Sequence, residues 1–378
     1  MPLYLKVVYL LFMFATLFVL SQLFFNKASS FSYSSPRTLK WNPVHLLIVS
    51  SWRSGSSFLG QIFNHHSDVF YLFEPGHPIW MKFQHKSSEQ LHYPLRNLLH
   101  SLYNCDMSPL RQYLPNGGNN INELTFFAET RALCTPPACS TFIPSEGYDR
   151  LRCYHRCRDT SLDKMAETCR MYSHVVMKTV RILDLSVLFT LLEDPALDLR
   201  ILHLVRDPRA VALSRTYFIL DIEDHIVLKK EGNENITISR VMEKICRSQV
   251  HINNVAKAAQ ALQGRYMAIR YEDLALEPLK SINKIYRFAS LHPTEDLEQW
   301  AYNITHQEQE EKNGVMTFSR ESSKVVQRWR TSLGFDFVEE IQESCKEAMV
   351  LFGYFPAQSK SEQRNLTLDL VDKEWSID

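Results

Sequence analysis

The chain has 378 residues, 45% of them hydrophobic, and carries 42 basic and 42 acidic side chains. This length and apolar share suit one large globular domain or two small ones. The balanced charge excludes a broad basic surface of the kind that binds nucleic acid, so any anion site must be local.

An uncharged apolar segment near the N-terminus, Val7 to Phe25, is long enough to cross a bilayer. It is short for a membrane span, which suits a thin membrane of the early secretory pathway. A cleaved signal peptide is the alternative, because Ala28, Ser29 and Ser30 are small enough for a cleavage site. The apolar core of a cleaved signal peptide is normally shorter than this segment, so we expect a retained signal-anchor.

Three glycosylation sequons, beginning at Asn235, Asn303 and Asn365, and eight cysteines indicate a lumenal, oxidising compartment for the rest of the chain. We therefore expect a single-pass type II membrane protein. The expected parts are a cytoplasmic tail at residues 1–6, the anchor at 7–25, a polar serine-rich stem at 26–43 and a lumenal domain at 44–378.

Five of the cysteines cluster between residues 134 and 169. A zinc site would prefer Cys-x2-Cys pairs, and the sequence has none. We predict disulfides that staple an irregular insertion, with the connectivity left open, and no metal.

Short apolar runs that fit buried strands alternate with helical stretches. The predicted strands are 45–51, 69–73, 174–178, 199–205 and 266–271, and predicted helices include 185–192, 241–262 and 279–290. This alternation is typical of an α/β fold with a central parallel sheet covered by helices on both faces.

The first predicted strand runs into a loop of small residues, Ser50 to Ser57, which is followed by apolar residues at helical spacing. A strand, a loop with exposed N–H groups and a helix N-terminus together favour an anion, and Arg53 adds a positive charge. The loop is not a Walker A sequence, because the dipeptide Gly-Lys is absent from the chain. The alternative is a plain serine-rich connection.

Residues 199–214 repeat this arrangement of a strand, a short turn and a helix N-terminus. The apolar run ends at Val205, Asp207 is a suitable N-cap and Pro208 a suitable first helical residue. Arg206 then leaves the strand end, and Ser214 lies about two turns into the helix. In a parallel sheet both lie at the same edge as Arg53, where such sheets bind ligands. The alternative is a surface ion pair beside a capped helix.

Four motifs in order resemble the Golgi carbohydrate 6-O-sulfotransferases, most closely the N-acetylglucosamine branch. They are SSWRSGSSF at Ser50 to Phe58, YLFEP at Tyr71 to Pro75, HLVRDPRAVALSR at His203 to Arg215 and RYEDLA at Arg270 to Ala275. The resemblance runs from about residue 44 to the C-terminus. It implies a P-loop-like sulfotransferase fold and sulfate transfer from 3′-phosphoadenylyl sulfate (PAPS) without a metal.

The same resemblance assigns residues. The first loop is similar to the family's 5′-phosphosulfate loop, and Arg206 and Ser214 match the Arg and Ser of its 3′-phosphate motif. The cofactor-binding residues implied are Ser50, Ser51, Trp52, Arg53, Ser54, Gly55, Ser56, Ser57, Arg206, Asp207, Pro208, Arg209, Ala210, Val211, Ala212, Leu213 and Ser214. Arg53 stands where cytosolic sulfotransferases have a lysine, so that lysine's switching role does not carry over.

The acceptor that the resemblance implies is the primary hydroxyl of a sugar, which is barely acidic. A base positioned to accept its proton would therefore speed the transfer. Glu74 ends the second strand and matches the family's Glu-Pro motif; with Arg53 it forms the predicted catalytic pair. His77 is the second candidate base, and a solvated carboxylate before Pro75 is the alternative for Glu74.

Further charged residues receive weaker predictions. Lys178 and Arg181 follow the third strand and could contact donor or acceptor, and Arg328 to Arg330 could close over the nucleotide. Surface ion pairs or core anchors are the alternatives for both groups. Tyr271 to Asp273 are expected to end the last strand and brace the loops.

Together with the predicted anchor, the resemblance implies a Golgi membrane sulfotransferase that acts on the 6-hydroxyl of N-acetylglucosamine in keratan-type or mucin-type glycans; the balanced charge gives no reason to expect a nucleic-acid partner. Galactose or N-acetylgalactosamine is the alternative acceptor, and a glycan-binding module without turnover the second alternative. A metal-dependent glycosyltransferase is disfavoured because no Asp-x-Asp triplet is present, and a nucleotide kinase because Gly-Lys is missing. The sequence does not decide the oligomeric state, and a homo-oligomer is one possibility.

Overall fold

The computed structural model describes residues 42–217, 222–229, 236–305 and 322–376. The chain divides at residue 41 into two units, and the second, Asn42–Asp378, contains the whole described fold. The predicted tail, anchor and stem lie outside the described residues. Within the described ranges, no helix combines the length and apolar character that crossing a membrane requires.

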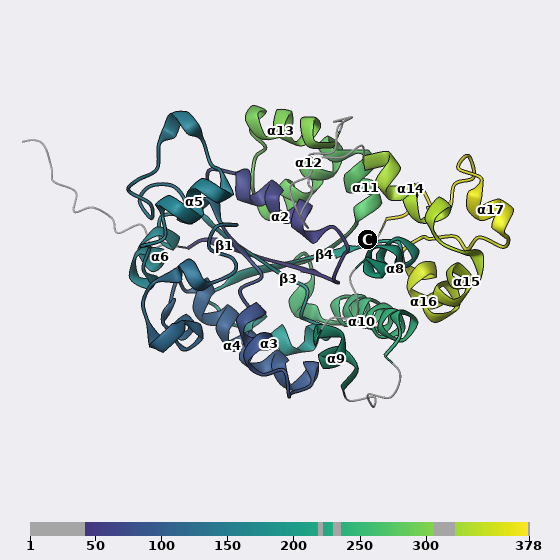
Figure 1. Cartoon of the computed structure of the whole chain (residues 1–378), viewed down its shortest axis with the longest axis horizontal. Coiled ribbons are helices and arrows are strands. Elements are labelled where there is room, and N and C mark those ends of the chain that lie inside the picture. The colour runs from purple at the N-terminus through teal and green to yellow at the C-terminus, as the bar shows by residue number, and fades with distance from the viewer. Residues whose placement is uncertain (1–41, 218–221, 230–235, 306–321, 377–378) are drawn as a thin grey trace, which may run out of the picture. The chain divides into compact units, whose positions relative to one another are not determined.

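A five-stranded, wholly parallel sheet forms the centre of the fold (Figure 1). Its strands are β1 (Val44–Ser50), β2 (Val69–Phe73), β3 (His174–Thr179), β4 (Asp198–Val205) and β5 (Tyr266–Arg270). They lie in the order β2-β3-β1-β4-β5. The five predicted strands are confirmed, each boundary to within one residue.

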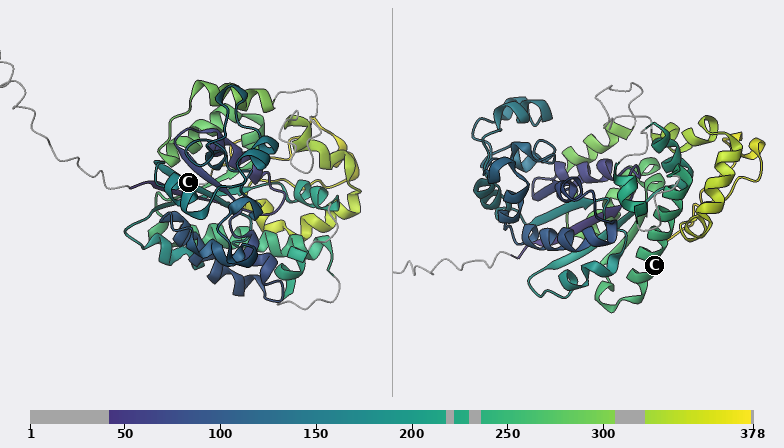
Figure 2. Two further views of the ribbon diagram at one scale, coloured as in Figure 1. Left: turned by 60° about the vertical axis from the view of Figure 1, so that its left-hand side comes forward. Right: turned by 60° about the horizontal axis from the view of Figure 1, so that its bottom comes forward.

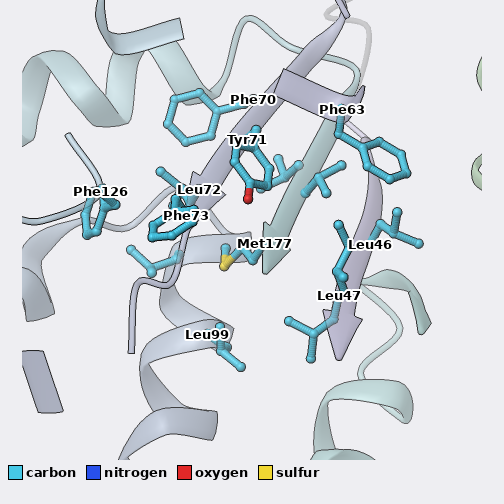
Figure 3. Close-up of a cluster of buried hydrophobic side chains, with 14 of the residues drawn as sticks. Leu46, Leu47, Phe63, Phe70, Tyr71, Leu72, Phe73, Leu99, Phe126 and Met177 are labelled. Carbon is cyan, nitrogen blue, oxygen red and sulfur yellow. The ribbon is translucent and has the colours of Figure 1, made fainter. Parts of the chain in front are cut away.

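The middle of the sheet is apolar on both faces. All residues of β2 and β3, and all but the first of β1, are buried. Figure 3 shows Leu46, Leu72 and Met177 among the side chains of this core. Burial on both faces is the reason that these strands are largely apolar, which made them recognisable in the sequence, although β3 also buries His174 and Lys178.

Helices cover both faces of the sheet (Figures 1 and 2). On one face lie α2 (Ser56–His65), α11 (Tyr271–Leu276), α12 (Pro278–Ala289) and α13 (Glu295–Thr305). On the other lie α3 (His77–Lys82), α4 (Ser88–Tyr103), α9 (Ile222–Leu228) and α10 (Ile238–Ala258). Helix α2 packs so tightly on β2 that a Cβ at Gly60 would lie 2.0 Å from the Tyr71 hydroxyl oxygen.

The C-terminal part of the chain forms a helical group beside α8 (Pro208–Thr216). Its helices are α14 (Ser322–Ser332), α15 (Phe335–Ser344), α16 (Lys346–Leu351) and α17 (Lys360–Arg364). A smaller apolar core, which includes Val211, Ile245 and Met349, joins this group to α8 and α10.

The three predicted helices are present; one differs in helix type and the other two in their ends. The stretch predicted at 185–192 is a 3-10 turn, Leu185–Leu188, followed by α7 (Phe189–Leu192). Helix α10 begins before its first predicted residue because the Thr237 hydroxyl accepts from the N–H of Arg240 and caps it. Capping residues outside the apolar pattern therefore shifted the boundaries.

All eight cysteines form disulfides, which confirms the prediction made for the five clustered ones. The pairs are Cys105–Cys169, Cys134–Cys153, Cys139–Cys157 and Cys246–Cys345. The first three staple the segment between α4 and β3, which contains short 3-10 turns, α5 (Arg150–Arg156) and α6 (Leu162–Cys169). The fourth ties α10 to the C-terminal helices.

Two of the three sequons are accessible: Asn303 and Asn365 are exposed. Asn235 lies outside the described residues.

Candidate active site

The strand order reverses beside β1. The chain passes from β1 to β2 on one side of the sheet and from β4 to β5 on the other, so the carboxyl ends of β1 and β4 form a topological switch point. Ligands of α/β sheets bind at such points. The loop after β1 and the residues after β4 are the two motifs that the sequence predicted as an anion site.

The loop after β1 is held in one shape. Ser50 Oγ donates to the carbonyl of Leu204 at 2.9 Å, and the hydroxyls of Ser51 and Ser54 lie 2.5 Å apart. Both Arg53 (φ 68°) and Gly55 (φ 85°) have left-handed backbone. A Cβ at Gly55 would lie 2.3 Å from the ring of Tyr271, so only glycine fits there. Helix α2 starts directly afterwards, at Ser56.

Three predicted site residues meet at this loop. The Nε of Arg53 donates to the Oγ of Ser214 at 3.0 Å, and the Nη1 of Arg206 donates to the carbonyl oxygen of Arg53 at 3.0 Å. The guanidinium of Arg206 lies 4.3 Å from the ring centroid of Tyr271. Among the described residues, the buried Nε of Arg206 has no hydrogen-bond partner. A fixed cation with an unused donor is suited to an anionic ligand.

The other residues of the second motif build the helix. Asp207 caps α8 by accepting from the N–H of Arg209, and the fully buried guanidinium of Arg209 is paired with Asp207 at 2.8 Å. The apolar side chains of Ala210, Val211, Ala212 and Leu213 are buried. Their assignment to the cofactor, with those of Pro208, Trp52, Ser56 and Ser57, stays a prediction that rests on the motifs.

A second charged group lies at the ends of β2 and β3. Glu74, at φ 47°, follows β2, and its carboxylate accepts from the Nζ of Lys178 and the Nη1 of Arg181. Burial raises the pKa of this carboxyl, but the charges of Lys178 and Arg181 outweigh it and hold the pKa at about 2. Glu74 is therefore ionised at neutral pH.

The two charged groups are connected through the first loop. The guanidinium of Arg181 lies 5.9 Å from the ring centroid of Trp52, the residue before Arg53, and 5.8 Å from that of Trp80. The two indole rings are 5.5 Å apart. Glu74, Lys178 and Arg181 thus lie at the same sheet edge as the loop after β1. His77 begins α3, and its N–H donates to the carbonyl of Glu74 at 3.0 Å.

Two residues that the sequence suggested as nucleotide contacts, Trp329 and Arg330, instead make contacts within the protein. The guanidinium of Arg330 donates to backbone carbonyls of the C-terminal segment, those of Glu362, Gln363, Asn365 and Leu368. The ring of Trp329 is buried 4.1 Å from the guanidinium of Arg209. Both anchor the C-terminal part of the chain, which corrects the sequence-based expectation; for Arg328 the expectation stays a prediction.

The segment after β5 braces the site, as the sequence predicted. The N–H of Asp207 donates to Glu272 Oε1 at 3.1 Å, and the hydroxyl of Tyr354 donates to Glu272 Oε2 at 2.8 Å. Burial, reinforced by the charge of Asp207, raises the pKa of Glu272 from near 4.5 to about 7. This carboxyl ties the end of β4 to the C-terminal segment.

We expect Glu272→Gln to flatten the dependence of stability on pH. Because the pKa of Glu272 is raised in the folded state, its protonated carboxyl contributes stability that is fully present below pH 4.5. This contribution is lost as the pH rises to about 7. The loss is of the order of 3 kcal/mol. Urea unfolding at pH 5 and pH 8 measures it. If the free energy of unfolding changed equally between pH 5 and pH 8 in wild type and variant, the raised pKa of Glu272 would be contradicted.

The chain is thus an α/β protein in which two arginines and a serine contact one another at the switch point of a parallel sheet. A family model described as "Sulfotransferase domain" matches residues 43–353, and the chain belongs to that family. Human carbohydrate sulfotransferase 6 is 46% identical over 336 residues, which cover 87% of this chain and 85% of the relative. Mouse carbohydrate sulfotransferase 4 is 40% identical over 346 residues, covering 89% and 88%.

Sequence reasoning missed one charged residue of this neighbourhood. Glu223, in α9, accepts from the Nη2 of Arg181 at 2.6 Å and is buried. The stretch around it is mixed in polarity, so nothing in the pattern separates a buried carboxylate from an exposed one.

Proposed function

We propose that this chain transfers sulfate from PAPS to the 6-hydroxyl of N-acetylglucosamine in keratan-type or mucin-type glycans. The observation that carries the proposal is the meeting of Arg53, Arg206 and Ser214 at the carboxyl end of β1. Relatives that cover most of the chain are carbohydrate sulfotransferases, which supports a sugar hydroxyl as acceptor.

The residues present fit the donor. Arg206, with its unused Nε, and Ser214 are suited to a 3′-phosphate, and this pair would distinguish PAPS from nucleotides without that group. The N–H groups of the first loop and the N-terminus of α2 are suited to the phosphosulfate end. Once bound, the donor supplies the sulfuryl group and a phosphate leaving group.

The chain's own residues then perform two tasks. Arg53 stabilises the negative charge that grows on the leaving phosphate as the S–O bond to it breaks. Glu74 accepts the proton of the sugar O6 as that oxygen bonds to sulfur. Its low pKa makes it a weak base, so alignment of the acceptor contributes most of the rate.

We also propose the membrane topology that the sequence predicts. The protein would be a type II Golgi membrane protein with residues 44–378 in the lumen. The four disulfides and the exposed Asn303 and Asn365 support an oxidising, glycosylating compartment for that domain.

An acceptor panel tests the substrate. The protein would be incubated with PAPS carrying labelled sulfate and with oligosaccharides ending in N-acetylglucosamine, galactose or N-acetylgalactosamine. We expect the highest kcat/KM with N-acetylglucosamine. A preference for either of the other sugars would assign the alternative acceptor, and label in none of them would favour a glycan-binding module.

A further inference from the structure

A line of buried ion pairs leads from Glu74 into the protein. Arg181 lies between two carboxylates, since its Nη1 donates to Glu74 and its Nη2 donates to Glu223 Oε1 at 2.6 Å. The side chain of Arg181 is 2% exposed and that of Glu223 is 9% exposed. Arg181 follows β3, whereas Glu223 belongs to α9, which packs against α10 (Figure 1).

The next residue of α9 makes a second buried pair. Asp224 accepts from the Nη2 of Arg215, and both side chains are less than one tenth exposed. Arg215 directly follows Ser214 in α8, and Ser214 is the residue that accepts from Arg53. Two adjacent carboxylates of one short helix thus hold two arginines, one beside Glu74 and one beside Ser214.

The charges of this network balance. Glu74 and Glu223 face Lys178 and Arg181, and Asp224 faces Arg215. A buried charge that loses its partner is strongly destabilised, so the surroundings rearrange. Without Glu223, Arg181 would lose one of its two carboxylate partners and Glu74 would face two buried cations without that second negative charge. We expect Arg181 to shift and to move the carboxylate of Glu74 with it.

The geometry points to Glu223 and Asp224 as positioning residues of the transfer reaction. Glu223 holds Arg181 so that Glu74 keeps its orientation towards the acceptor, and Asp224 holds Arg215 so that Ser214 keeps its place in the donor site. This assignment rests on the proposed function. It makes α9 the element that fixes the acceptor side and the donor side relative to each other.

The two roles predict separate kinetic effects. Glu223→Gln should lower kcat about ten- to a hundredfold, the scale of a catalytic group displaced by an ångström. Its affinity for PAP, the 3′-phosphoadenosine 5′-phosphate that PAPS leaves after sulfate transfer, should stay unchanged. Asp224→Asn should weaken PAP binding about tenfold and raise KM for PAPS, with a smaller effect on kcat. A merely structural ion pair would instead lower the folded fraction and leave both parameters per folded molecule unchanged.

The experiment uses the full-length protein, with PAP affinity from titration calorimetry and steady-state kinetics normalised to the folded fraction. Glu146→Gln is the matched control, because Glu146 also bridges two arginines, Arg152 and Arg156, but on the exposed disulfide-rich segment. Glu146→Gln should leave kcat and PAP affinity at wild-type values.

Glu223→Asp decides the outcome should Glu223→Gln fail to fold. It retains the charge balance but is one methylene shorter, so a lowered kcat with wild-type PAP affinity supports the proposal. Wild-type kcat in a folded Glu223 variant, or parallel losses of kcat and PAP affinity in the Glu223 and Asp224 variants, would overturn it. Absence of sulfate transfer by the wild type is a different result and refutes the proposed function itself.

Discussion

Glu74→Gln is expected to lower kcat by about 10²–10⁴-fold, the contribution of a general base, while PAP affinity falls far less. The amide cannot accept the O6 proton. It also removes the negative charge between Lys178 and Arg181, which are both buried. Steady-state kinetics and calorimetric titration of PAP with the same preparations measure the two effects. An unchanged kcat would move the base elsewhere, and His77 would be the next candidate.

The pH dependence of the rate tests independently whether Glu74 is ionised and ion-paired. Because its pKa is depressed to about 2, the carboxylate contributes stability that is present above pH 4.5 and lost as pH falls towards 2. The wild-type rate should therefore show no titration of Glu74 between pH 5 and 8. A rate that rises through a pKa near 6 and loses this step in Glu74→Gln would contradict the ion-paired geometry.

Arg53→Ala is expected to lower kcat by about 10²–10³-fold, the scale of removing one group that stabilises developing charge. It also removes the hydrogen bond to Ser214, so PAP binding should weaken. Activity measured at saturating PAPS separates the two effects. Wild-type turnover would remove Arg53 from the reaction.

The backbone at Arg53 complicates that test. At φ 68° arginine and alanine are both strained because each has a Cβ, whereas asparagine tolerates the left-handed region better. Arg53→Asn therefore separates loss of charge from loss of loop shape and should show the same drop in kcat. Arg53→Lys retains the charge without the planar fork, so an intermediate rate is expected.

The sheet and the loop after β1 could be predicted for one physical reason. Parallel strands buried on both faces are mostly apolar, so β1 and β4 are visible as near-continuous apolar runs, and the residues after them lie at one edge. That edge brought Arg53, Arg206 and Ser214 together.

Other features depend on contacts between distant segments and leave no local pattern. The partners of Cys105 and Cys246 lie 64 and 99 residues away. The sequence leaves Arg330 open between a nucleotide contact and a core anchor, because an exposed arginine and one that binds backbone carbonyls look the same in sequence. Glu223 and Asp224 resemble a solvated helix face, and only the fold places Arg181 and Arg215 against them.

The most direct test of this account is whether the purified protein moves labelled sulfate from PAPS to a terminal N-acetylglucosamine, with the product's sulfate located by NMR. We predict transfer to the oxygen on carbon 6 by the wild type and at most a hundredth of that rate by Arg53→Asn. PAP binding without transfer to any sugar hydroxyl, or equal rates for both proteins, would contradict it.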